Sequence, residues 1–401
     1  SFPVFFIIIA MGSGISQGGT ALIANALGEK DQTKAHHTCV QCLSFGVFFA
    51  VGLTAVGLFS APMLFQILGA SGEYLEVALD YINLILCGTL FIVIQSIANA
   101  CLNAQGDTKT YRNVLIASFF LNCVLDPWFM YGGFGIPTMG IRGIALATIV
   151  IQFLGMLYLI HRLSRTKLLE GPILSMLAPS STYREIARQG FPASFNMVSV
   201  AVGIFIITLF ISKFSTESVA AYGIATRIEQ IILLPTIGLN IAVLSMTGQN
   251  NGAKKPERIR KTLKTTMKYG LLMMISGGFL LYFLAETMMR VFSEDAIVIR
   301  HGTDYLRIAS ITLCSYVILF QTVNLLQGLK KPFFALVIGV CRQVLAPCIV
   351  FYLLAFKLDM RESGVWWGIF LVTWSAAIIS YFYGRSVLRR RLSSPAEFTE
   401  S

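Results

Sequence analysis

Long apolar segments alternate with short polar ones along the whole chain. Each apolar segment is about 20–30 residues long, and a helix needs about 20 residues to cross the hydrocarbon core of a bilayer. The segments lack the ten-residue alternation of apolar and polar positions that marks the strands of a membrane barrel. The pattern predicts an all-α polytopic membrane protein with eleven spans, at 2–26, 38–60, 80–103, 112–131, 143–161, 189–212, 218–248, 266–286, 304–327, 333–355 and 364–383.

Composition and charge agree with this pattern. Of the 401 residues, 55% are hydrophobic and 13% are charged, whereas soluble domains carry about 25% charged residues. The net charge of +11 comes mainly from polar segments between spans, and 22 of the 31 lysines and arginines fall on the side of segment 28–37. Basic loops mark the cytoplasmic side. The charge therefore predicts an orientation in the bilayer, and we expect no nucleic-acid partner.

An internal repeat divides the chain. Four pairs of matching anchors are separated by nearly constant intervals: Leu79–Ile82 with Thr303–Leu306, Gly28 with Gly252, Gln105-Gly106 with Gln327-Gly328, and Gly143 with Gly364. Both copies start on the same side of the membrane, which indicates a parallel duplication about an axis along the membrane normal. The repeat predicts two pseudo-symmetric helical lobes.

The repeat also sets the expected boundaries. We expect an N-terminal lobe at 1–161, a cytoplasmic linker at 162–188, a C-terminal lobe at 189–386 and a cytoplasmic tail at 387–401. The second lobe has six predicted spans and the first has five. We therefore expect eleven helices of an original twelve, with the first helix of the repeat lying before residue 1.

Polar side chains at membrane depth are the candidates for function, because they are costly there. Asp126 lies in the span 112–131, and Asn122 shares its helix face four residues earlier. These oxygens can bind Na⁺, or the carboxylate can hold a proton, and Pro127 leaves one helix carbonyl without its usual donor. Alternatively, Asp126 caps the helix end or faces water at the outer surface.

Three further sets of residues leave alternatives open. Gln95, Asn99 and Asn103 form a polar stripe that either lines a cavity or joins helices by hydrogen bonds. Gln321, the repeat counterpart of Asn99, favours a cavity in both lobes. Arg227 and Glu229 lie within one span and Arg342 lies within another, where a buried ion pair or capping of carbonyls is expected.

Other motifs carry less weight. Gly14 and Gly18 form a GxxxG pattern, which predicts close helix packing rather than a nucleotide loop. His36, His37, Cys39 and Cys42 have no further ligand group nearby, so we do not predict a metal site there. The sequence contains no convergent catalytic set, P-loop or HExxH motif, which argues against an enzyme.

Several motifs in this order resemble the multidrug and toxic compound extrusion (MATE) family, and in particular its DinF-like branch. The resemblance covers essentially the whole chain. It is carried by Ala21–Gly28, Leu102–Lys109, Asn122–Pro127, Gly143–Thr148 and Gly248–Ala253.

The resemblance implies a monomeric secondary antiporter in a prokaryotic plasma (inner) membrane. By alternating access between two lobes, it would export cationic or amphipathic compounds in exchange for H⁺ or Na⁺, without a cofactor. The branch places its coupling ion, a possible Na⁺, on residues that map onto Asn122, Asp126 and Thr148, and its substrate cavity on Gln95 and Asn99. The rival hypotheses are a flippase for lipid-linked saccharides and a membrane scaffold that does not transport.

Overall fold

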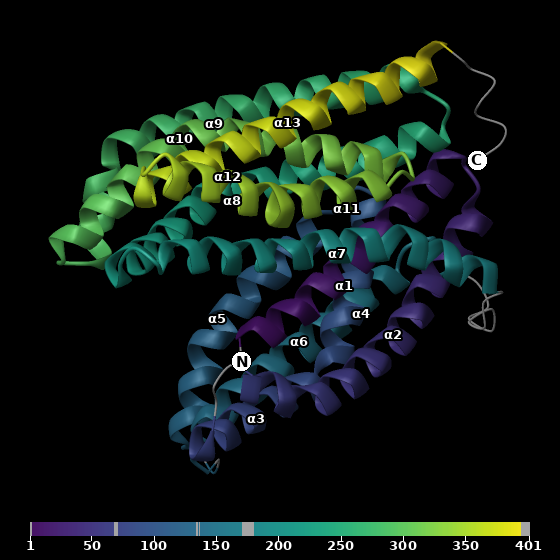
Figure 1. Ribbon diagram of the computed structural model, residues 1–401. Coiled ribbons are helices and arrows are strands. Elements are labelled where there is room, and N and C mark those ends of the chain that lie inside the picture. Colours follow the sequence, from purple (N-terminus) through teal and green to yellow (C-terminus); the bar gives the residue numbers. More distant parts are fainter. Residues whose placement is uncertain (1, 68–70, 134, 136, 171–179, 394–401) are drawn as a thin grey trace. The chain divides into compact units, whose positions relative to one another are not determined.

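The computed structural model describes residues 2–67, 71–133, 135, 137–170 and 180–393. Helices make up nearly all of this part of the chain (Figure 1). In order they are α1 (Phe2–Gly28), α2 (Gln32–Ile67), α3 (Gly72–Cys87), α4 (Thr89–Ala104), α5 (Lys109–Tyr131), α6 (Ile141–Ser164), α7 (Ser180–Ile211), α8 (Thr216–Gly252), α9 (Pro256–Phe292), α10 (Ala296–Gly328), α11 (Phe333–Val340), α12 (Ala346–Phe351) and α13 (Arg361–Ser393). Two π-helical segments, η2 (Cys341–Leu345) and η3 (Tyr352–Lys357), flank α12.

The predicted all-α membrane architecture is confirmed. Among the described residues, ten helices are long and apolar enough to cross a membrane, and the bent pair α3 and α4 makes an eleventh span. The bend measures 43° and falls at Gly88, within the predicted straight span 80–103. A Cβ at Gly88 would lie 2.7 Å from Cγ1 of Ile149 on α6, so the close approach of α6 requires a glycine at the bend.

Residue contacts divide the chain into two compact units, Ser1–Phe195 and Asn196–Ser401. In unit 1, α4 packs against α1, α2 and α6, and 13 of its 16 residues are buried, which makes it the central helix. In unit 2, α10 holds the corresponding position among α8, α9 and α13. The division falls inside α7. The predicted boundaries of linker and tail remain predictions, and their segments 171–179 and 394–401 lie outside the described residues.

Small residues join α1 to the first half of α7. A Cβ on Gly14 would lie 2.2 Å from the backbone nitrogen of Ser194, and one on Gly18 would lie 2.8 Å from that of Gly190. The Ser194 hydroxyl donates a hydrogen bond of 3.0 Å to the Met11 carbonyl. The predicted role of Gly14 and Gly18 in close packing is confirmed, with the pair Gly190 and Ser194 as the facing surface.

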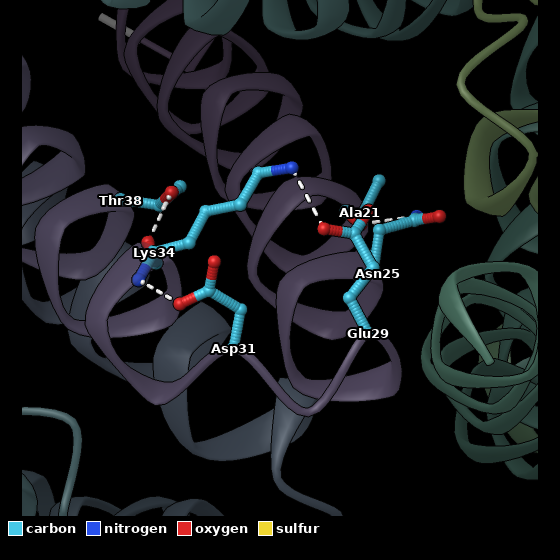
Figure 2. A network of polar contacts seen from close by, with 6 residues as sticks. All are labelled: Ala21, Asn25, Glu29, Asp31, Lys34 and Thr38. Atoms are coloured by element: carbon cyan, nitrogen blue, oxygen red, sulfur yellow. Dashed lines mark hydrogen bonds and ion pairs between the residues drawn. The ribbon is translucent and has the colours of Figure 1, made fainter. Parts of the chain in front are cut away.

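Polar contacts hold the turn between α1 and α2 (Figure 2). Lys34 forms an ion pair of 2.7 Å with Glu29, and its backbone N–H donates to the Asp31 carboxylate over 2.8 Å. The turn also needs a left-handed residue, which is Lys30 with φ of 61°. These contacts lie at the end of the helices rather than within the apolar spans, where such groups would be costly.

The same backbone turn recurs at the interval of the sequence repeat. Lys30 and Lys254 are both left-handed and are 224 residues apart. Gly106 and Lys330 form a second left-handed pair with the same separation, although Lys330 lies two residues beyond Gly328, the sequence match of Gly106. Each residue follows the end of a helix, where the left-handed conformation closes the last turn. The duplication therefore extends from the residue pattern to the backbone conformation.

The tight contact between α1 and α7 generates a first prediction. Replacing Gly14 with alanine should lower the free energy of unfolding by about 1–3 kcal/mol, because the added methyl group meets backbone that cannot move aside. Gly52→Ala is the matched control, since no atom lies within 4 Å of a Cβ at this helical glycine. The measurement is equilibrium unfolding of the purified protein in detergent. Equal losses in the two variants would contradict the assigned contact.

Candidate cation and substrate site

The start of α5 is fixed by the Asp107 carboxylate. Its Oδ1 accepts hydrogen bonds of 3.1 Å from the backbone N–H groups of Lys109 and Thr110. Its Oδ2 accepts the Thr110 hydroxyl over 2.5 Å. The two backbone N–H groups are among those that a helix start leaves without a partner inside the helix. Asp107 thereby sets the position of the helix that carries Asn122 and Asp126.

Asp126 is a half-buried carboxylate without a hydrogen-bond partner among the described residues. Its Oδ1 is fully covered and accepts no hydrogen bond. It lies five residues before α5 ends at Tyr131, so it does not cap the helix end. A covered acceptor of this kind is costly unless a proton, an ion or water satisfies it. The observation fits the predicted cation or proton site and removes the capping alternative.

Asn122 and Thr148, the predicted partners of Asp126, each have a side-chain oxygen that can accept a further interaction. Asn122 donates its side-chain N–H to the Ser118 carbonyl over 2.9 Å, which leaves the amide oxygen available as a ligand. Thr148 lies on α6, the helix that packs against α5, and donates its hydroxyl to the Ile144 carbonyl over 3.0 Å. Its oxygen keeps lone pairs for a second interaction. The grouping of these three residues into one ion site remains a prediction.

Tyr81 of α3 is a neighbour of Asp126 that the sequence analysis missed. Its phenol is close enough to Asp126 for the charge of the carboxylate to act on it. The signal was present in the repeat, because Tyr81 belongs to the matching segment Leu79–Ile82.

The polar stripe on α4 is buried and incompletely paired. Gln95 and Asn99 are 5% and 9% exposed, and their side-chain oxygens accept no hydrogen bond from the described residues. A Cβ on Gly155 of α6 would lie 3.0 Å from the Gln95 oxygen, so glycine makes room for this amide. Unpaired oxygens favour the cavity alternative over helix-to-helix hydrogen bonding. The assignment of both residues to a substrate cavity remains a prediction.

Gln321 of α10 behaves differently from its counterpart Asn99. It is fully buried, and its side-chain N–H donates a hydrogen bond of 3.1 Å to the Thr266 carbonyl on α9. This bond joins two helices, as polar residues in membrane bundles often do. The side-chain oxygen has no partner among the described residues. The predicted cavity role of Gln321 therefore rests on this oxygen alone.

Unit 2 holds a second buried carboxylate, Glu229 of α8. It is 5% exposed and accepts a hydrogen bond of 2.5 Å from the Tyr305 hydroxyl. Tyr305 is the repeat counterpart of Tyr81; Tyr305 contacts its carboxylate directly, whereas Asp126 acts on Tyr81 through its charge alone. The exposed Arg227 lies on the same helix. Glu229 thus has a tyrosine as its direct partner, where an ion pair was one expectation.

Metal ligation by clustered side chains finds no support in the part of the chain that is described. No group of three or more histidine, cysteine or acidic side chains there is arranged to hold a metal ion. His36 instead makes a hydrogen bond of 2.8 Å with the Leu168 carbonyl, and His37 one of 2.7 Å with Gln41. A Na⁺ ion at Asp126 would need a different set, made of carboxylate, amide and hydroxyl oxygens.

Two helical units with ten to eleven helices of membrane-spanning length among the described residues define a polytopic membrane protein. The MatE family model matches residues 1–128 and 192–353, and the chain belongs to this family. The predicted resemblance is therefore confirmed.

Relatives and solved structures agree with this assignment. The chain is 27% identical over 303 residues to a probable multidrug resistance protein, NorM, of Thermotoga maritima, which covers 75% of this chain and 64% of that protein. It is 25% identical over 355 residues to a protein of Shewanella oneidensis named FAD transporter, with coverages of 86% and 76%. A solved MOP superfamily transporter from Pyrococcus furiosus matches with a TM-score of 0.91 at 24% identity, over 97% of this chain and 87% of that one. That likeness establishes the fold.

The Asp107 contacts predict a pH-dependent contribution to stability. Burial raises the pKa of Asp107, but the hydrogen bonds from Thr110 and the backbone more than offset this, so the net pKa is lowered. The stabilisation is therefore present above the unfolded pKa of about 3.9 and is lost as the pH falls through the folded pKa. Asp107→Ala should cost about 1 kcal/mol of unfolding free energy at pH 7.

Unfolding in detergent between pH 7 and pH 3 checks this prediction. The gap between the native protein and Asp107→Ala should close at the acid end of the range. Asp107→Asn is the matched control, because an amide oxygen still accepts the backbone hydrogen bonds but does not titrate. A gap that stays constant with pH would contradict the role of the ionised carboxylate.

Proposed function

We propose that this chain is a secondary transporter that exports cationic or amphipathic small molecules in exchange for H⁺ or Na⁺. The observation that carries the proposal is the half-buried Asp126 carboxylate, which has one fully covered oxygen and no hydrogen-bond partner among the described residues. Membership in the MatE family and the multidrug resistance relative support the export of small molecules. The proposed setting is a prokaryotic cell membrane, with the protein acting as a monomer.

The proposed coupling follows from the cost of charge at membrane depth. A bare carboxylate there is unfavourable, and binding a proton or Na⁺ removes its charge. Asn122 and Thr148 would add oxygen ligands for Na⁺, and the Cys123 carbonyl lacks its helical donor because of Pro127. Occupied and empty states would then differ in charge, so they would favour different helix arrangements. Transport would follow as binding sites open alternately to the two sides of the membrane.

The proposed substrate contacts lie on the central helices. Gln95 and Asn99 carry unpaired oxygens on α4, and Gln321 carries one on α10. Such acceptors favour a ligand with N–H donors or positive charge. Export of an anionic dinucleotide is a second candidate function, because the Shewanella oneidensis relative is named FAD transporter.

The proposal predicts that Asp126→Asn in the full-length protein abolishes ion-driven efflux while expression and folding persist. The amide keeps the size of the side chain but cannot exchange a proton or pair with Na⁺. The measurement is ethidium export from proteoliposomes under separate Na⁺ and pH gradients. The gradient that drives export in the native protein identifies the coupling ion, and flavin dinucleotide in the same assay tests the second candidate.

Asp304→Asn provides a control with the same chemical change. Asp304 is exposed on α10 in unit 2, so its loss should leave efflux within about twofold of the native rate. Native efflux in Asp126→Asn would exclude the site. Equal loss in both variants would show that any Asp→Asn change in a helix disturbs the protein, which would also remove support for a specific role.

A further inference from the structure

Unit 2 contains a cavity of about 240 Å³ that the proposed coupling at Asp126 does not use. Its walls come from α7, α8, α10, α13 and the region around α12, and most of the lining is aliphatic or aromatic. Pockets for drug-sized ligands measure about 300–1,000 Å³, so this one suits a single-ring compound. Two charged side chains, Glu229 and Arg342, line the same space.

Glu229 is held in a fixed direction by aromatic neighbours. It accepts the Tyr305 hydroxyl over 2.5 Å, and the Tyr316 hydroxyl also interacts with it. Tyr305 packs edge to face against Trp366 with ring centroids 5.0 Å apart, and against Tyr222 at 5.5 Å. A carboxylate offers about four acceptor positions. Capacity for a donor from a ligand therefore remains after the tyrosine contacts.

Arg342 faces the same cavity from the π-helical segment η2. Its guanidinium carbon lies 5.9 Å from the centre of the Tyr316 ring, so the side chain lies along the aromatic wall. The segment exists because Pro347 has no N–H, and the Ala346 N–H instead bonds the Cys341 carbonyl five residues back. Arg342, a half-buried residue, also lines a neighbouring cavity of about 160 Å³.

The two charges are not paired directly. Each acts electrostatically on the other, yet the described part of the chain contains no salt bridge of either Glu229 or Arg342. Both interact with Tyr316, so this one side chain contacts the carboxylate and the guanidinium. The cavity thus presents a negative group and a positive group to one mainly apolar space. A ligand with the opposite arrangement of charges would satisfy both.

We propose that this cavity is a binding site for small aromatic zwitterions. Glu229 receives the ammonium group of the ligand, Arg342 receives its carboxylate, and the ring lies against Tyr316 and Phe320. Charge-assisted hydrogen bonds at both ends make the site selective for compounds that carry both charges. A compound with one charge leaves the other protein charge without a partner in an apolar cavity. This site goes beyond the proposed function, because binding here needs no coupling ion.

Calorimetric titration of the full-length protein in lipid nanodiscs tests the proposal at neutral pH without an ion gradient. Three matched probes share one ring: 4-(aminomethyl)benzoic acid as the zwitterion, benzylamine as the cation and benzoate as the anion. The zwitterion should bind at least about tenfold more tightly than either single-charge compound. Equal binding of the three, or no binding of the zwitterion, would overturn the proposal. Neither result bears on Asp126, since transport is not measured.

Substitutions test which protein side chain binds each charged end of the ligand. Glu229→Gln should remove the advantage of the zwitterion over benzoate, and Arg342→Gln should remove its advantage over benzylamine. Each single variant leaves one charge unpaired and can fail to fold, so Glu229→Gln combined with Arg342→Gln is made as well. The double variant should bind all three probes alike. An advantage that survives in the double variant would contradict the site.

Arg227→Gln is the matched control for loss of a positive charge. Arg227 lies two residues before Glu229 on α8 but is exposed and is not among the residues that line the cavity. The zwitterion should bind this variant as it binds the native protein. A loss equal to that of Arg342→Gln would show a general effect of net charge, which would also overturn the assignment.

Discussion

A carboxylate in a membrane-embedded bundle must be neutralised, hydrogen bonded or hydrated, because hydrocarbon contains no hydrogen-bond donor for it. Two carboxylates of this chain, Glu229 and Asp126, differ in this respect. Glu229 accepts a phenolic hydroxyl and shares its cavity with a guanidinium. Asp126 has no hydrogen-bond partner among the described residues, although one of its oxygens is fully covered. The first carboxylate is stabilised in place, whereas the second remains open to an ion or a proton.

The duplicated backbone allows the surroundings of Asp126 in unit 1 to be compared with those of Glu229 in unit 2. Left-handed residues recur 224 residues apart at the ends of helices, and Tyr81 and Tyr305 occupy matching places. The acids do not match, since Asp126 lies on α5 and Glu229 on α8. The two units therefore share a tyrosine at the same place of the repeat but carry their carboxylates on different helices. One fold can in this way carry two chemically distinct sites.

The sequence predicted the class of fold and the number of spans because bilayer thickness sets the length of apolar segments. The predicted spans are shorter than the helices: α2 runs over Gln32–Ile67, whereas the expected span was 38–60. Hydrophobicity marks only the part in lipid, while backbone hydrogen bonds continue the helix into water. The bend at Gly88 was not predicted, and the side chain that packs closest to this glycine, Ile149, is distant from it in sequence.

The candidate site was predicted in part. Asp126 can be predicted as a site residue because a charged side chain within a membrane span is costly. Asn122 can be predicted because it lies four residues earlier on the same helix face. The neighbouring Tyr81 needs the arrangement of α3 and α5, which no local pattern contains. Gln321 shows the limit of reasoning by repeat: its oxygen and that of Asn99 both lack a partner among the described residues, but the Gln321 N–H also donates a hydrogen bond to another helix, at the Thr266 carbonyl. Residue type is inherited through the repeat, but hydrogen-bond partners depend on the neighbouring helix.

Infrared difference spectroscopy tests the central claim most directly. The full-length protein in lipid is recorded with and without Na⁺, and at two pH values in the absence of Na⁺. The account predicts a carboxyl band that changes with one of these cations and is missing from the difference spectrum of Asp126→Asn. A difference spectrum that is identical in the native protein and this variant would contradict the claim that Asp126 is the group that binds the coupling cation.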